Sequence, residues 1–144
     1  MSLDISVRAP GLWRRLASLF YEFILLFGVL LLGLVFPHVL LGVLTHWAAS
    51  APVLWAHLFL LLLVYCVGFW CYGGQTLAMK TWRIRVLARD GTRLRLWQAL
   101  WRYLLCWPSL LCGGIGIFWA LVDRDGQFLH DRLAGTRLVD VSKP

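Results

Sequence analysis

The chain has 144 residues, of which 60% are hydrophobic, and its mean hydropathy is +0.74. A soluble domain is roughly 45–50% apolar, and a chain this short forms one domain at most. The core of one such domain cannot bury all of the additional apolar side chains. The net charge of +7 would suit a nucleic-acid-binding protein, but the basic residues lie between hydrophobic blocks. There they hold loops in the cytoplasm and attract anionic lipid. Composition therefore predicts an integral membrane protein and excludes soluble and nucleic-acid-binding classes.

The first apolar run, residues 16–36, contains a single charge, Glu22. At 1.5 Å per residue, about 20 residues cross a hydrocarbon core of roughly 30 Å. The run predicts a transmembrane helix that ends at Pro37. The apolar residues 39–44 are expected to restart this helix or to lie in the interface.

The second apolar run, residues 53–72, carries no formal charge. Tryptophan and tyrosine gather at membrane interfaces, and tryptophans flank both runs: Trp47 and Trp55 at one interface, and Trp13, Trp70 and Trp82 at the other. A second transmembrane helix is therefore predicted.

The central loop, residues 73–96, carries six basic side chains and one acid, Asp90. Apolar and basic residues alternate on both sides of Asp90-Gly91, which is typical of a β-hairpin. The hairpin is expected to lie on the inner membrane surface or against the helix ends. Residues 136–141 are expected to add a short third strand.

The third apolar region, residues 97–122, is interrupted at Pro108 and at Gly113-Gly114. Its two halves are each short for a full crossing, so the breaks favour a re-entrant or interfacial segment, with one kinked crossing as the alternative.

The tail, residues 123–144, is soluble in character. The predicted fold class is a membrane all-α protein with two transmembrane helices, a third broken segment and a small cytoplasmic β-hairpin.

Loop charge predicts the orientation of the chain. The amino-terminal flank holds Arg8, Arg14 and Arg15, the connection at residues 46–52 holds no Lys or Arg, and the central loop holds six. The positive-inside rule places the amino terminus and the central loop in the cytoplasm. The basic tail favours the same side, which argues again for a third segment that does not cross.

Glu22 is the most informative single residue, because a carboxylate about six residues, or roughly 9 Å, into a membrane helix is costly and is paired or faces an aqueous path. Arg15 lies seven residues earlier on the same helix face, and Arg102 is the other charge inside an apolar region. Two interpretations remain open. Glu22 is the centre of an ion or proton site, or it forms a buried ion pair that fixes helix packing.

A second polar cluster contains His130, Asp131, Asp123 and Asp125. Such residues bind divalent cations in some proteins, but this spacing fits helix capping and pairing with arginines better, so no metal is expected. The cysteines form no C-x-x-C pair, and no serine has a nucleophile–base setting in the sequence. We expect no cofactor and no enzymatic activity.

Four segments resemble the RDD family: the Arg14-Arg15 helix start with an acid at position 22, the segment GQTLAMK at 74–80, Arg102-Tyr103, and HDRLAGT at 130–136. The resemblance covers roughly residues 8–141 as a single membrane domain. The family is named for one arginine and two aspartates. By position these are Arg15, Glu22 in place of the first aspartate, and Asp131, with Asp123 as an alternative. The family motifs also include Gln75, Thr76 and His130.

The resemblance implies a bacterial inner-membrane protein for which transport is suggested, with cation/proton antiport proposed for some members. The leading hypothesis is ion or small-solute transport by a homo-oligomer, because two or three short helices do not enclose a pathway alone. The alternative is a non-catalytic accessory or scaffold subunit of a larger membrane complex. The lipid bilayer is a partner in both cases, with anionic lipid at the basic loop.

Overall fold

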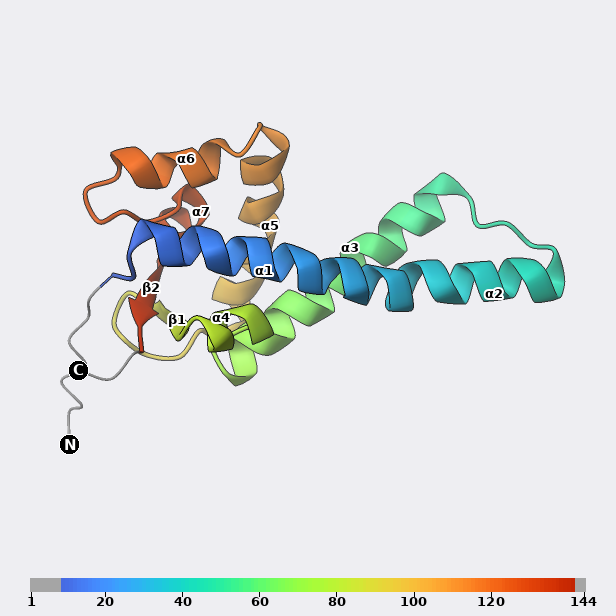
Figure 1. Ribbon diagram of the computed structural model, residues 1–144, viewed down its shortest axis with the longest axis horizontal. Coiled ribbons are helices and arrows are strands. Elements are labelled where there is room, and N and C mark those ends of the chain that lie inside the picture. Colours follow the sequence, from blue (N-terminus) through green and yellow to red (C-terminus); the bar gives the residue numbers. More distant parts are fainter. Residues whose placement is uncertain (1–8, 142–144) are drawn as a thin grey trace.

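The computed structural model describes residues 9–141, so Arg8 and Lys143, which entered the charge count, lie outside the described residues. The chain forms a compact head and a long stalk (Figure 1). The stalk consists of the second half of the first helix, residues 46–50 and the first half of α3 (Ala51–Tyr72). The head contains the first half of the first helix, a two-stranded sheet and four further helices: α4 (Leu77–Thr81), α5 (Leu96–Leu111), α6 (Ile115–Val122) and α7 (Leu129–Leu133).

The first membrane helix is longer than predicted. It comprises α1 (Leu12–Leu30), the π-helical turn η1 (Leu31–Val35) and α2 (Phe36–Thr45), which together form one apolar helix of 34 residues. The prediction that Pro37 ends the helix is wrong. In η1 the Phe36 N–H bonds to the Leu31 carbonyl five residues back, and this wider turn accommodates the proline ring, which would clash inside a regular α-helix.

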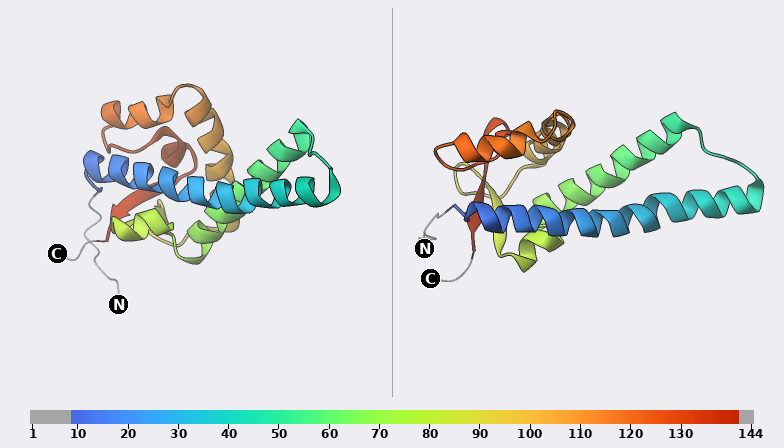
Figure 2. Two further views of the ribbon diagram at one scale, coloured as in Figure 1. Left: turned by 45° about the vertical axis from the view of Figure 1, so that its right-hand side comes forward. Right: turned by 45° about the horizontal axis from the view of Figure 1, so that its top comes forward.

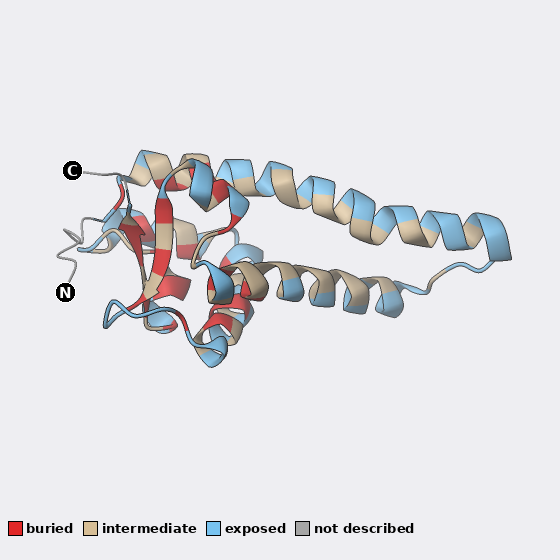
Figure 3. Cartoon of the chain, turned by 90° about the horizontal axis from the view of Figure 1, so that it is seen from below, coloured by how far each residue is buried: buried red, intermediate tan, exposed pale blue. Residues whose placement is uncertain are grey.

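The second predicted helix is confirmed as α3 (Ala51–Tyr72), an apolar helix long enough to cross a membrane. It contacts η1, where a Cβ on Gly33 would approach the Leu61 side chain to 2.9 Å. From there the two stalk helices diverge toward their connecting loop (Figure 2). Most stalk residues are exposed or half-buried, whereas the buried residues gather in the head (Figure 3).

The sheet of the head contains β1 (Ile84–Ala88) and β2 (Thr136–Asp140), paired antiparallel with Ile84 opposite Asp140. The predicted third strand is therefore present as β2, but the hairpin within the central loop is a wrong prediction. Residues 92–95 do not pair as a strand, because the Gln98 side chain accepts a hydrogen bond from the Arg95 N–H at 3.2 Å and so caps the start of the next helix. β2 occupies the pairing edge of β1 instead.

The third apolar region is broken where the sequence predicts it. α5 (Leu96–Leu111) and α6 (Ile115–Val122) meet at 95°, and both Gly113 and Gly114 have positive φ angles. Pro108, by contrast, lies inside α5. Ser109 of α5 packs so closely on Gly116 of α6 that a Cβ there would lie 1.5 Å from the hydroxyl oxygen.

The strand pairing of the head bears on the topology of the two apolar spans. β1 belongs to the central loop and β2 to the tail, so their pairing places both on the same side of a membrane crossed by the stalk. Arg14, at the start of α1, pairs with Asp140 and donates to the Trp82 carbonyl at 2.7 Å. Residues 96–122 therefore start and end on one side, as a re-entrant or interfacial segment does.

Candidate functional site

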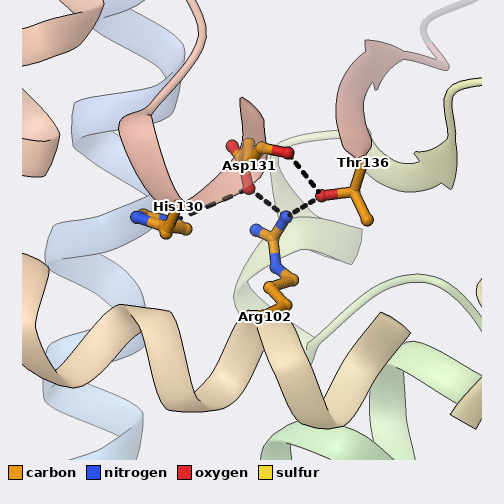
Figure 4. A network of polar contacts seen from close by, with 4 residues as sticks. All are labelled: Arg102, His130, Asp131 and Thr136. Carbon is orange, nitrogen blue, oxygen red and sulfur yellow. Dashed lines mark hydrogen bonds and ion pairs between the residues drawn. The ribbon is translucent and has the colours of Figure 1, made fainter. Parts of the chain in front are cut away.

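A buried ion pair joins the elements of the head (Figure 4). Arg102 of α5 donates from Nη1 to the Asp131 carboxylate of α7 (Leu129–Leu133) and to the Thr136 hydroxyl of β2, the latter at 2.9 Å. The guanidinium also lies over the Trp70 ring of α3, 4.8 Å from its centroid. Because Arg102 is 2% exposed and Asp131 0%, the pair is desolvated and ties four elements together.

His130 lies beside this pair, with Nε2 3.6 Å from an Asp131 carboxylate oxygen and its ring stacked on Phe128. Burial holds the pKa of His130 below its ordinary value. Arg102 adds to that effect and Asp131 opposes it. The imidazole is therefore neutral near pH 7, and Asp131 keeps Arg102 as its charged partner.

Arg15 of α1 reaches the same region. Its side chain is 2% exposed and interacts electrostatically with Asp131, and it lines a small cavity together with Arg102 and His130. The structure thus brings together four of the predicted site residues: Arg15, Arg102, His130 and Asp131. They come from α1, α5 and α7.

Glu22 lies apart from that group. Its carboxylate accepts a hydrogen bond from the Thr76 hydroxyl, which also caps α4 (Leu77–Thr81) by accepting from the Met79 N–H at 3.3 Å. Tyr65 of α3 interacts with the same carboxylate. Within residues 9–141, no Lys, Arg or His lies at ion-pair distance from Glu22, so the expected pairing with Arg15 or Arg102 does not form.

The model of one protein family, the RDD family, matches residues 9–135. The chain belongs to the RDD family. Comparisons with curated proteins and with solved structures gave no significant match. The matched range includes Arg15, Glu22 and Asp131. The chain is thus an RDD-family membrane protein with two apolar spans.

Two further predicted site residues, Gln75 and Asp123, hold the loops of the head in place. Gln75 donates from Nε2 to the Ile84 carbonyl at 2.8 Å and so fixes the entry to β1. Asp123 pairs with Arg132 and accepts from the Gln127 N–H at 3.0 Å, which closes the turn after α6. In the described part of the chain, no three His, Cys, Asp or Glu side chains gather as metal ligands do.

Sequence reasoning missed two aromatic members of these groups in the RDD head. Trp70 supplies the ring under Arg102, and Tyr65 faces Glu22. The sequence presents Trp70 as an interface residue and Tyr65 as one of many apolar-helix positions. Their position offers one signal for membership of these groups. Both residues lie near the carboxyl end of α3, which is the end that enters the head.

Proposed function

We propose that this RDD protein transports a cation or small solute in exchange for a proton, with Glu22 as the residue that takes up the proton or cation. The observation that carries the proposal is the missing countercharge. Glu22 sits about 15 Å along α1 from its first residue, in an apolar span, and no basic side chain of residues 9–141 lies at ion-pair distance from it. A carboxylate in such a place is neutralised by a proton or by a bound cation.

The competing role for Glu22 is a buried ion pair that fixes helix packing. Both arginines expected to pair with Glu22 interact with Asp131 instead. Arg102 donates hydrogen bonds to Asp131 and Thr136, and Arg15 interacts electrostatically with Asp131. The Thr76 hydroxyl is a neutral donor that tolerates both states of the carboxyl, because it bonds to a carboxylate and to a protonated acid alike. Glu22 is therefore suited to change its charge state during a cycle.

A single copy does not enclose a pathway, and the proposal requires a homo-oligomer. The stalk contributes only two helices, and large apolar side chains are exposed along both, among them Phe27, Leu32 and Val64. Neighbouring copies and lipid together cover such faces. By the positive-inside rule the head, with the central loop and the tail, faces the cytoplasm of a bacterial inner membrane, which places Glu22 near the cytoplasmic end of the span.

The alternative role, an accessory subunit of a larger membrane complex, is favoured by α6. Ile115, Phe118 and Val122 recur there at helical spacing and are exposed, Val122 by 80%. A short apolar helix outside the stalk would suit a contact with another membrane protein. Purification of a stoichiometric partner together with background-level flux would support this role over transport.

The test is proton movement in proteoliposomes, read with an internal pH dye after a cation gradient is imposed. We expect the wild type to couple the two gradients and Glu22→Gln to reduce coupled proton movement at least tenfold. Asp125→Asn, which removes an exposed carboxylate of the head, is the matched control and should behave as wild type. Equal background-level movement in wild type and Glu22→Gln for every cation tried would refute the proposal.

A further inference from the structure

The guanidinium of Arg15 is the most unusual buried group of the head. Its side chain is almost completely removed from solvent, yet its Nε and Nη1 atoms have no hydrogen-bond partner among residues 9–141. Buried charged groups are nearly always paired and hydrogen-bonded, because desolvation of an unpaired charge is very costly. Arg15 thus has buried donors that donate no hydrogen bond to any side chain among residues 9–141.

The buried charges around Arg15 do not balance. Arg15 and Arg102 carry one positive charge each. Among residues 9–141, the buried acid that interacts with both is Asp131, which is bonded to Arg102. His130 is neutral near pH 7, since burial lowers its pKa. The group of Arg15, Arg102 and Asp131 therefore carries an excess of one positive charge.

A cavity adjoins the unsatisfied guanidinium atoms. It measures about 30 Å³ and is lined by Arg15, Ser18, Arg102, Phe128 and His130, with apolar side chains closing the rest. Roughly 10–15 Å³ suffices for one water-sized species. Arg102 also lines this cavity, and its Nε atom has no hydrogen-bond partner among the described residues. Asp131 does not line the cavity.

We infer that this cavity binds one small inorganic anion of halide size, with chloride as the ion available in cells. The anion accepts hydrogen bonds from the arginine donors and neutralises the excess charge, and both effects are large in a low-dielectric site. A water molecule would accept the hydrogen bonds but leave the charge. The site lies seven residues, about 10 Å along α1, from Glu22 and is independent of its role in transport.

The test is the unfolding temperature of the purified full-length protein, measured in sodium chloride and in sodium gluconate at equal ionic strength. Chloride at ten times its dissociation constant should raise the midpoint by about 3–6 °C in a saturable manner, and bromide should act similarly. Arg15→Met removes the charge and keeps the volume. It should fold, be at least as stable as wild type in gluconate, and show no halide response. Arg124→Met, which removes an exposed charge, should respond as wild type does.

Two outcomes would overturn the inference. Equal unfolding temperatures of wild type in chloride and gluconate would mean that water fills the cavity. A halide response that persists in Arg15→Met would mean that the ion binds elsewhere as an adventitious ligand. In crystals grown with bromide, an anomalous peak between Arg15 and Arg102 would support the site, and an empty cavity would contradict it.

Discussion

Replacement of Asp131 by Asn tests the energetics of the head. Asn preserves the shape of the side chain and its ability to accept a hydrogen bond from Arg102, but removes the negative charge. Asp131 is fully buried and Arg102 nearly so, and Arg15 interacts electrostatically with the same carboxylate. The substitution therefore leaves two buried guanidiniums without a protein countercharge.

The expected loss of stability is large. Removal of one partner of a buried pair costs about 3–5 kcal/mol, because the remaining charge stays desolvated. That is roughly two to nearly four powers of ten in the unfolding equilibrium constant. The exposed carboxylate of Asp125 forms no ion pair of the head, so Asp125→Asn should change the free energy of unfolding by less than about 0.5 kcal/mol.

Equilibrium unfolding in a fixed detergent, followed by tryptophan fluorescence, measures both variants. The double variant Asp131→Asn with Arg102→Met should recover part of the loss, because one of the unpaired charges is gone. A loss below about 1 kcal/mol for Asp131→Asn alone, or no recovery in the double variant, would refute the view that a desolvated ion pair ties α5 to α7 and β2.

Two further predictions concern pH and helix packing. Because burial lowers the pKa of His130 in the folded protein, the unfolded chain binds a proton first on acidification. The contribution of neutral His130 to the free energy of unfolding should then be complete above about pH 6.5, and the free energy of unfolding should decrease as the pH falls below that value. His130→Gln should flatten that fall in unfolding measured between pH 5 and 8, and an unchanged slope would contradict the assignment. Gly116→Ala should lower the free energy of unfolding by about 1–3 kcal/mol through the clash with Ser109, whereas Gly28→Ala, with open space around its Cβ position, should raise it by about 0.5–1 kcal/mol. Thermal unfolding compares the two, and equal effects would contradict the close contact of α5 and α6.

The sequence predicts those parts of the fold that depend on local composition. The two spans follow from apolar runs of sufficient length, and the bend between α5 and α6 follows from Gly113-Gly114, whose positive φ angles are strained for other residues. Charge counting predicts one side of the membrane for the tail and the central loop, and β1 of the loop pairs with β2 of the tail.

Features that depend on tertiary contacts escaped prediction. Turn chemistry at Asp90-Gly91 suggested a local hairpin, but β1 pairs with residues about 50 positions later, a choice that strand patterns do not encode. Pro37 ends a helix by local rules, and the π turn before it is not visible in the sequence. Arg102 pairs with Asp131 across 29 residues, and spacing alone did not favour Asp131 over Glu22.

Difference infrared spectroscopy of the carboxyl group tests the proposed role of Glu22 most directly. On acidification of the membrane-reconstituted protein, a protonated-carboxyl band should appear that is absent in Glu22→Gln, and addition of the transported cation should remove it. Asp125→Asn should retain this band. Identical spectra of wild type and Glu22→Gln at every pH, or a Glu22 band that no cation displaces, would contradict the account of Glu22 as a site where proton and cation exchange.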